Sequence, residues 1–410
     1  MAERGVVPNV HTYGFLLNGL CKSGEMIAAK VLLIEMQSKG IEVKDSIVNK
    51  LVYGYCKKGD VDDAIKFMSL MEKKGFEPSV ISYNSIAKGL CKANRHEEAK
   101  TLLFTMVEKG VALNMFSYRM LIDIFCKQGD LAEAKRRLRE MENEGMKPDV
   151  FTYNVFINGY CKKGLIKEAY EIRNEMEEKG VMPDVYTYNI LVLEECMAGR
   201  VDDAKKVFDE MPQRGLARNH VSYTTMISGL SNKGRMEEAK RTLREMESEG
   251  IKPNVMMYNC LVTGECMAGK VDNAKKLFDE MPHRGLAQDA VSYTAMISGL
   301  VKEGRMEEAF KLFDEMPVRG LPRNALSYTA LISGLAKEGR MEEAFKLFDE
   351  MPVRGLARNV VIYTAMISGL SKKGRMEEAS KLSDEMKSEG ISSDDNLDSF
   401  LKESVRSVKG

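Results

Sequence analysis

Small hydrogen-bonding side chains recur at intervals of 35 residues along this chain, and they are its best candidates for chemistry. When a 35-residue repeat is counted from Val10, the fifth place is Asn or Thr and the last place is Asp, Asn or Ser in nine of eleven repeats. The fifth-place residues are Asn49, Asn84, Asn154, Asn189, Thr224, Asn259, Thr294, Thr329 and Thr364. The last-place residues are Ser79, Asn114, Asp184, Asn219, Asn254, Asp289, Asn324, Asn359 and Asp394. An unconstrained surface place would drift toward Lys, Glu or Arg, so these side chains predict recognition of a partner by hydrogen bonds.

Two further rows of residues share this spacing. The second place is apolar in nine repeats, at Ile81, Phe116, Phe151, Tyr186, Val221, Met256, Val291, Leu326 and Val361. The thirteenth place is Lys in eight repeats, at Lys22, Lys57, Lys92, Lys127, Lys162, Lys302, Lys337 and Lys372. Met197, Asn232 and Met267 interrupt the lysine row. From the residues alone, ordinary packing between repeats explains an apolar second place as well as contact with a ligand does.

Eight cysteines raise the question of a metal or disulfide site. Seven of them occupy the twelfth place of their repeats: Cys21, Cys56, Cys91, Cys126, Cys161, Cys196 and Cys266. Equivalent residues of stacked helices lie about 8 to 10 Å apart, beyond the reach of a disulfide, so we expect reduced, small and buried thiols. No CxxC pair is present and the four histidines are scattered, so we predict no metal site and no cofactor.

The composition narrows the possible functions. Lys+Arg 61 balances Asp+Glu 61, so any nucleic acid or anionic membrane must be held by local charges rather than by a net field. No apolar run approaches the roughly 18 residues that cross a bilayer, which argues against a transmembrane helix. The absence of Trp, with 29 Met and 33 Gly, is typical of a repeated sequence rather than of a mixed enzyme domain.

The residues that are constant between repeats predict the elements that position these rows. Ala occupies the twentieth place and Met the twenty-seventh in all eleven repeats, so both lie on one face of a helix. Gly occupies the thirty-first place throughout and the fifteenth in ten repeats, with Asn94 as the exception, as left-handed helix ends favour. We therefore predict a first helix over about places 3 to 13 and a second over about places 16 to 29. Thr152 is a predicted N-cap of a first helix.

Each predicted helix has one apolar stripe, as residues 150–184 illustrate. Its first helix carries Tyr153, Ile157 and Tyr160, and its second carries Ile166, Ala169, Ile172 and Met176. A hairpin of this size cannot bury both stripes alone, so neighbouring repeats must stack to complete the core. The predicted fold is all-α: a right-handed superhelical α-solenoid of stacked helix-turn-helix repeats.

The repeats fill residues 10–394 without a gap. Their predicted boundaries are 10–44, 45–79, 80–114, 115–149, 150–184, 185–219, 220–254, 255–289, 290–324, 325–359 and 360–394. Residues 1–9 match the end of a repeat, so we expect a remnant of a truncated repeat, a natural chain that extends upstream and a targeting segment outside this sequence. Residues 395–410 are predicted to form a capping helix and tail.

The repeat resembles the pentatricopeptide repeat (PPR) family in several motifs. These are the fourth-place Tyr, the GLCK or GYCK segment, the EEA start of the second helix, the EM pair and the G-x-x-P-D ending. Tetratricopeptide repeats have a period of 34 and a Trp-containing signature that is absent here. Pro after the EM pair, as at Pro212, resembles editing-type members, but the unbroken spacing favours the pure-repeat P class. The nearly identical repeats 290–324 and 325–359 resemble those of fertility restorers.

The resemblance implies roles for the recurring residues. In this family the fifth and last places select one RNA base per repeat, the second place stacks on bases and the thirteenth place meets phosphate. Asn with Asp implies U, Asn with Asn or Ser a pyrimidine, Thr with Asn A, and Thr with Asp G. The implied target is 5′-N-C-Y-N-U-Y-A-U-A-A-G-3′. Gly14 with Lys44 and Arg119 with Asp149 depart from the pattern, so their bases are undetermined. Helix capping is the alternative for the fifth-place residues, but we expect it not to explain the last place.

The leading hypothesis is a single-stranded RNA binder that acts by occupying its site, in RNA processing, stabilisation or translation control. We expect no enzyme activity, because no room remains after residue 394 for a deaminase or nuclease domain. The expected protein is a monomer with no membrane or DNA partner, and it could recruit an RNA-processing enzyme in trans. The resemblance implies a plant mitochondrion, with the plastid (chloroplast) as the alternative. The competing hypothesis is a protein-binding helical scaffold.

Overall fold

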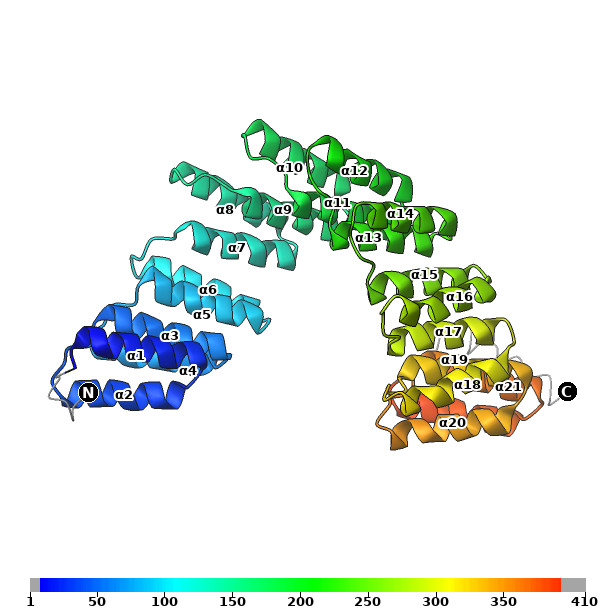
Figure 1. Cartoon of the computed structure of the whole chain (residues 1–410). Helices are drawn as coiled ribbons and strands as arrows, with labels where there is room; N and C mark the ends of the chain where they lie inside the picture. Colours follow the sequence, from blue (N-terminus) through cyan, green and yellow to red (C-terminus); the bar gives the residue numbers. More distant parts are fainter. Residues whose placement is uncertain (1–7, 392–410) are drawn as a thin grey trace. The chain divides into compact units, whose positions relative to one another are not determined.

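The computed structural model describes residues 8–391, and every regular element in that range is an α-helix. The helices occur in consecutive pairs along the chain (Figure 1). Their starts recur every 35 residues. The predicted all-α architecture of helix-turn-helix repeats is therefore confirmed. Asp394 and the predicted capping helix lie outside the described residues, as does most of the 1–9 segment.

The first helices of the pairs carry the second-, fifth- and thirteenth-place rows, and the last-place residues immediately precede them. They are α1 (Val10–Ser23), α3 (Asp45–Lys58), α5 (Val80–Lys92), α7 (Met115–Gln128), α9 (Val150–Lys162), α11 (Val185–Met197), α13 (His220–Asn232), α15 (Val255–Met267), α17 (Ala290–Lys302), α19 (Ala325–Glu338) and α21 (Val360–Lys372). The second helices are α2 (Met26–Ser38), α4 (Val61–Lys73), α6 (His96–Glu108), α8 (Leu131–Asn143), α10 (Ile166–Glu178), α12 (Val201–Gln213), α14 (Met236–Ser248), α16 (Val271–His283), α18 (Met306–Val318), α20 (Met341–Val353) and α22 (Met376–Ser388).

Each first helix starts at the first place of its repeat, two residues earlier than predicted. Thr152 is not the N-cap of α9; that residue is Asp149, the last place of the preceding repeat, whose backbone is extended at φ −111°. Its Oδ1 accepts the N–H of Thr152 at 3.1 Å. The other last-place side chains, from Asn114 to Asn359, cap the helices that follow them in the same way. The expectation that capping does not explain the last place is thus wrong, because a short acceptor there satisfies an otherwise unpaired helical N–H.

The turns between paired helices have the predicted left-handed backbone. Gly164, between α9 and α10, has φ 73°, which a glycine adopts without steric cost. Asn94 replaces glycine between α5 and α6 and has φ 61°, in keeping with the tolerance of asparagine for this region. Each turn reverses the chain, so that the second helix packs against the first.

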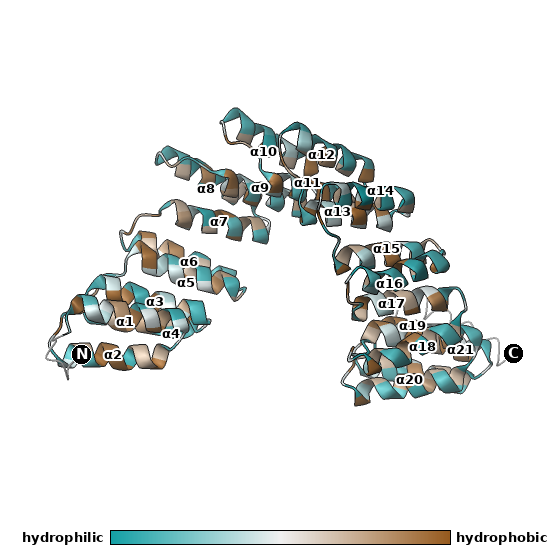
Figure 2. Ribbon diagram, viewed as in Figure 1, coloured by the Kyte–Doolittle hydropathy of each residue, from teal (hydrophilic) through white to brown (hydrophobic). Residues whose placement is uncertain are grey.

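The core consists of the constant residues and the predicted apolar stripes. Ala29 and Met36 are fully buried, as are their equivalents Ala169 and Met176. In residues 150–184 the predicted stripe residues Tyr153, Ile157, Ile166 and Ile172 are also buried, whereas Tyr160 is half-buried. Figure 2 shows hydrophobic and hydrophilic residues alternating along each helix, as expected for helices with a single buried face.

The helices form two compact bodies: an N-terminal body up to Ile190 and a C-terminal body from Leu191 onward. Within each body the first helices of consecutive repeats pack together, as α7 does with α9 and α15 with α17. Glycine at the tenth place permits this approach. A Cβ on Gly159 would lie 2.8 Å from the Cβ of Cys126, and one on Gly299 would lie 2.4 Å from the Sγ of Cys266.

The cysteines of the described residues form no disulfide and are buried or half-buried, and burial raises the pKa of the Cys126 thiol to about 12. The twelfth place therefore holds a small packing residue against the glycine of the next repeat. Within residues 8–391, none of the helices combines the length and apolar character that crossing a bilayer requires.

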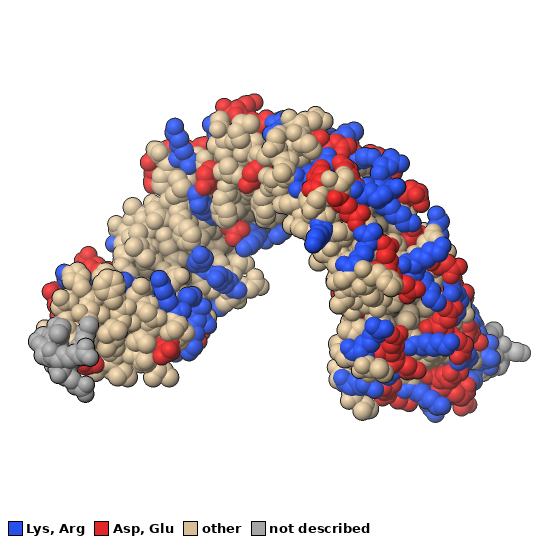
Figure 3. All heavy atoms as spheres, in the orientation of Figure 1, with Lys and Arg blue, Asp and Glu red and all other residues tan. Residues whose placement is uncertain are grey.

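Ion pairs connect the second helices of neighbouring repeats on their exposed sides. Arg235 lies 2.6 Å from Asp202 of the preceding repeat and 2.6 Å from Glu238 of its own. Arg305 makes the equivalent contacts with Asp272 and Glu308, each at 2.7 Å. Over the C-terminal body, Figure 3 shows basic and acidic side chains interleaved on the visible face.

Candidate nucleic-acid interface

The fifth-place and last-place side chains lie next to each other, although 30 residues separate them in sequence. The fifth-place Asn amide donates to the last-place oxygen in the pairs Asn84 to Asn114 at 3.1 Å, Asn154 to Asp184 at 3.2 Å, and Asn259 to Asp289 at 3.1 Å. Where the fifth place is Thr, the last-place amide donates to its hydroxyl oxygen, in the pairs Asn324 to Thr294 at 3.1 Å and Asn359 to Thr329 at 3.3 Å. The Ser79 hydroxyl donates to Asn49 Oδ1 at 3.1 Å. The structure thus brings the two predicted rows together in pairs.

Thr224 and Arg119 make other contacts. Asn189 belongs to the N-terminal body and Asn219 to the C-terminal body, and the partner predicted for Thr364 lies outside the described residues. The Thr224 hydroxyl donates to the carbonyl oxygen of His220 at 2.6 Å. In one of the two repeats that depart from the sequence pattern, Arg119 forms a salt bridge with Asp149. The polar atoms of that pair are directed at each other.

The orientation of each fifth-place amide follows from its neighbours. The backbone N–H of Ser117 donates to Asn114 Oδ1 at 3.0 Å, which assigns the oxygen of that amide. Asn84 must therefore turn its Nδ2 toward Asn114. The carboxylate of Asp184, which only accepts, imposes the same orientation on Asn154. Each of these amides keeps one further N–H, so it presents a hydrogen-bond donor.

Threonine at the fifth place presents a hydrogen-bond acceptor instead of a donor. The hydroxyls of Thr294 and Thr329 donate to the carbonyl oxygens of Ala290 and Ala325, one helical turn earlier, at 2.6 and 2.7 Å. Because a hydroxyl has a single hydrogen, its oxygen can then only accept. A Thr repeat therefore suits a base edge with an amino or imino donor, and an Asn repeat suits a carbonyl edge.

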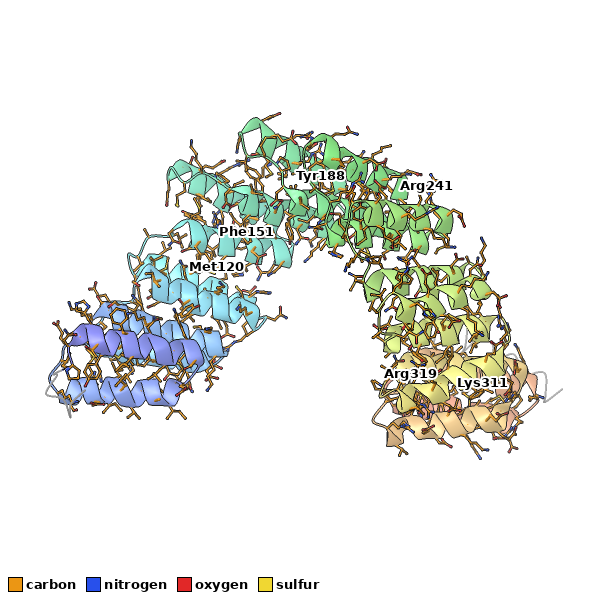
Figure 4. The ribbon with its side chains drawn as sticks, viewed as in Figure 1. Met120, Phe151, Tyr188, Arg241, Lys311 and Arg319 are labelled. Atoms are coloured by element: carbon orange, nitrogen blue, oxygen red, sulfur yellow. The ribbon has the colours of Figure 1, made fainter. Side chains whose placement is uncertain are left out.

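The second-place side chains are exposed, from 37% for Phe116 to 66% for Leu326. They therefore do not form a fully buried interface between repeats. Phe151, labelled in Figure 4, is 56% exposed, and its ring lies 5.5 Å from the Arg119 guanidinium. Exposed apolar and aromatic side chains at regular spacing are suitable platforms for stacking on planar ligands.

All four rows meet in one pocket of the N-terminal body. This pocket of about 390 Å³ lies between the second-place residues Ile81 and Phe116. Asn84 and Asn114, a hydrogen-bonded pair, line it together with the row lysines Lys57 and Lys92. A planar ligand seated there would have apolar groups at its faces, hydrogen-bonding groups at its edge and ammonium groups nearby.

The eight predicted lysines are exposed in the last turns of their helices. This position is favourable for a cation, because the helix C-terminus has partial negative charge. Lys57 donates to the carbonyl oxygen of Lys22 at 3.0 Å, and Lys127 pairs with Asp123 at 2.7 Å. Their ammonium groups remain accessible to an anion.

Tyr53 and Lys88 also line the pocket, and the sequence analysis missed them. Both occupy the ninth place, one helical turn after the fifth, so they share its face of the helix. The residue type at this place varies over the first six repeats, although it is Ser or Thr in the last five, at Ser228, Thr263, Ser298, Ser333 and Ser368. Helical spacing from the fifth place would have identified it.

Family models match most of this chain. The model described as "PPR repeat family" matches residues 44–92, 78–127, 116–162, 148–194, 253–302, 288–337 and 358–396. Models described as "PPR repeat" match 4–37, 179–212 and 326–356, and a "Pentatricopeptide repeat domain" model matches 206–264. A comparison with curated proteins gives no match.

Solved structures share the fold. The crystal structure of the pentatricopeptide repeat protein PPR10 from maize matches with a TM-score of 0.67 and 22% identity, covering 100% of this chain and 68% of that chain. PPR10 in complex with an 18-nt psaJ RNA element matches with a TM-score of 0.53 and 22% identity, covering 96% of this chain and 71% of that chain. Because the "PPR repeat family" model alone covers more than half of the sequence, this chain belongs to the pentatricopeptide repeat family.

Proposed function

We propose that this protein binds single-stranded RNA in a sequence-specific manner, with one base read by each of eleven 35-residue repeats. The observation that carries the proposal is the pocket in which a fifth- and last-place pair lies between two second-place side chains and beside two lysines. PPR10, which shares the fold, has been crystallised with an RNA element. A flat base with polar edges and a phosphate on either side fits this combination of groups.

The proposed target is 5′-N-C-Y-N-U-Y-A-U-A-A-G-3′. The hydrogen bonds support its pattern of donors and acceptors. The Asn259 amide presents a donor, which suits the carbonyl oxygens of U, and the Thr294 and Thr329 oxygens accept, which suits the amino group of A. Uridine and adenosine are therefore distinguished by complementary hydrogen bonding.

We further propose a P-class, fertility-restorer-like protein of plant mitochondria, or alternatively of plastids. Family membership supports the organellar location, and the unbroken spacing supports the class. The protein would act without catalysis, as a monomer that occupies its RNA site and blocks nucleases, remodels structure or recruits a processing enzyme.

The test is equilibrium binding by fluorescence anisotropy to the RNA CCCAUCAUAAG at two salt concentrations. A base-scrambled RNA and the matching DNA are the controls. We expect selective binding to the target RNA. Equal binding to the scrambled RNA, or no binding, would contradict the proposal and favour a protein-binding scaffold.

Asn259→Thr tests the reading of a single base. The variant pairs Thr with Asp289, so the preferred base at the eighth position should change from U to G. We expect the variant to bind the G8 RNA more tightly than the U8 RNA, by about 1 to 3 kcal/mol relative to the parent. Unchanged preference in the variant would contradict the reading by this pair.

A further inference from the structure

The polar cluster around each fifth-place asparagine includes a third member, from the next repeat. The hydroxyl of Thr187, at the third place of its repeat, donates to Asn154 Oδ1 at 2.7 Å. Ser117 makes the same bond to Asn84 Oδ1 at 2.8 Å. Both hydroxyl residues are fully buried, and both asparagines are at most 7% exposed. Each bond therefore lies in a region from which water is largely excluded.

This hydroxyl completes the set of contacts that determines the amide orientation. Asp184 Oδ1 accepts both the N–H of Thr187 at 2.9 Å and the Nδ2 of Asn154 at 3.2 Å. The oxygen of the Asn154 amide then faces Thr187, whose hydroxyl satisfies it. A flipped amide would place oxygen against oxygen at Asp184, and loss of the hydroxyl would leave Oδ1 buried without a partner.

The sequence shows the same association. Every fifth-place Asn is followed 33 residues later by a hydroxyl residue: Ser82, Ser117, Thr187, Ser222 and Ser292 after Asn49, Asn84, Asn154, Asn189 and Asn259. After the fifth-place Thr224 and Thr329, the corresponding residues are Met257 and Ile362. After Thr294 the residue is Ser327, whose hydroxyl donates to the Asn324 carbonyl oxygen at 2.8 Å.

One asparagine repeat shows the cluster without this bond. Ser292 donates to the backbone carbonyl oxygen of Asp289 at 2.8 Å, and the buried Oδ1 of Asn259 has no hydrogen-bond partner among the described residues. A change of the Ser292 rotamer would supply the missing donor. The amide of Asn259 is therefore less constrained than those of Asn84 and Asn154.

We propose that the third-place hydroxyl of the following repeat is a positioning residue that sets base selectivity by locking the fifth-place asparagine as a donor. This inference rests on the proposed function. The hydroxyl does not touch RNA; it holds the amide so that the free N–H points outward. Without it, Oδ1 is buried without a partner and the amide is held by the last-place residue alone, so its preference for an acceptor edge of a base becomes weaker.

The test is Thr187→Val in the full chain, which removes the hydroxyl while retaining the side-chain shape. Binding is measured to the target RNA and to the same RNA with A in place of U at the fifth base. We expect the preference for U to fall about fivefold, the equivalent of one neutral hydrogen bond. Thr187→Ser should retain the parental preference.

Thr152→Val is the matched control. Thr152 is also fully buried at the third place, and its hydroxyl contacts the cap residue Asp149 at 2.9 Å, but the fifth-place residue before it is Arg119. Both valine variants lose a contact to a cap, and Thr187→Val also loses the bond to Asn154, so we expect its thermal midpoint to fall at least as far as that of Thr152→Val. Only Thr187→Val should lose selectivity at the fifth base.

Two results would overturn the inference alone: parental selectivity in Thr187→Val, or an equal loss in Thr152→Val. A parent chain that does not discriminate between RNAs would instead overturn the proposed function, and the inference with it. If Thr187→Val does not fold, Ser117→Ala provides the same test at the third base of the target.

Discussion

At the residue scale, comparing an exposed second-place side chain with a buried one on the same helix distinguishes a role in RNA binding from a role in core packing. Phe151 and Phe156 lie on the same helix, α9, but the first is 56% exposed and the second fully buried. Phe151→Ala should weaken RNA binding by about 1 to 3 kcal/mol, the usual contribution of stacking on one base, and leave the thermal midpoint nearly unchanged.

Phe156→Ala is the comparison for that prediction. It should lower the free energy of unfolding by about 3 to 5 kcal/mol, because it opens a cavity in the core. Thermal melts measure the stability of both variants, and fluorescence anisotropy measures their affinity for RNA. A large loss of stability in Phe151→Ala with unchanged RNA affinity would assign the second place to packing.

Residue roles were predictable where a side chain repeats in type, and unpredictable where its partner belongs to another repeat. Ala169 and Met176 were assigned to the core because their spacing places them on one helical face. The bond from Thr187 to Asn154 joins residues 33 apart, so helical periodicity does not reveal it. The N-cap was misplaced at Thr152 because Thr and Asp are both good caps, and only the backbone geometry distinguishes them.

At the element scale, the close packing of first helices depends on the tenth-place glycine. Gly159→Ala should destabilise the protein by about 1 to 3 kcal/mol, because its Cβ would lie 2.8 Å from the Cβ of Cys126. Gly19→Ala occupies the same place in α1, where no atom lies within 4 Å of the added Cβ. That control should gain up to about 1 kcal/mol from helix propensity.

Chemical denaturation of both alanine variants measures these effects. Equal changes in the two would show that helix propensity alone governs the tenth place. The double variant Gly159→Ala with Cys126→Gly removes the opposing Cβ, and it should recover part of the loss if crowding is the cause.

The ion pairs between second helices predict a dependence of stability on pH. Hydrogen bonds from Arg235 lower the pKa of Glu238 to about 2. A carboxyl with a lowered pKa in the folded state contributes its full stability above its unfolded pKa, about 4.3, and loses it as pH falls toward 2. The thermal midpoint should therefore decrease as pH is lowered over this range.

Arg235→Gln should reduce the thermal midpoint at pH 7 and have a smaller effect near pH 2. Lys311→Gln, which replaces an exposed cation on α18 labelled in Figure 4, is the control and should change the midpoint little at either pH. Melting followed by circular dichroism from pH 7 to pH 2 provides the measurement. A constant difference between parent and Arg235→Gln at all pH values would contradict the assignment.

At the scale of the whole molecule, zero net charge on the protein is compatible with RNA binding that weakens as the salt concentration rises. Lys+Arg 61 equals Asp+Glu 61, yet the eight row lysines are exposed in the first helices. If all eight meet phosphate, log affinity should fall with log salt at a slope of about −5 to −6. Anisotropy at several salt concentrations measures this slope, and a slope near zero would contradict a phosphate role.

Lys162→Ala should reduce the magnitude of the slope by about 0.7, the contribution of one phosphate contact to a single strand. Lys127→Ala should reduce it by less, because Asp123 already pairs with that ammonium at 2.7 Å. The comparison distinguishes phosphate contacts from a general effect of net charge, since both variants remove one positive charge.

The last-place residue has two roles, in helix capping and in the pair proposed to read a base, and together they constrain how such an array can evolve. From Asn114 to Asn359 this residue caps the next helix and also belongs to the pair proposed to read a base, so selection for folding favours the short acceptors Asn and Asp there. The side chain of Ser79 makes no such capping bond. Single-nucleotide codon changes connect asparagine with aspartate and with serine. A lineage can therefore exchange one target base for another through intermediates that all retain a short polar side chain where the helix starts.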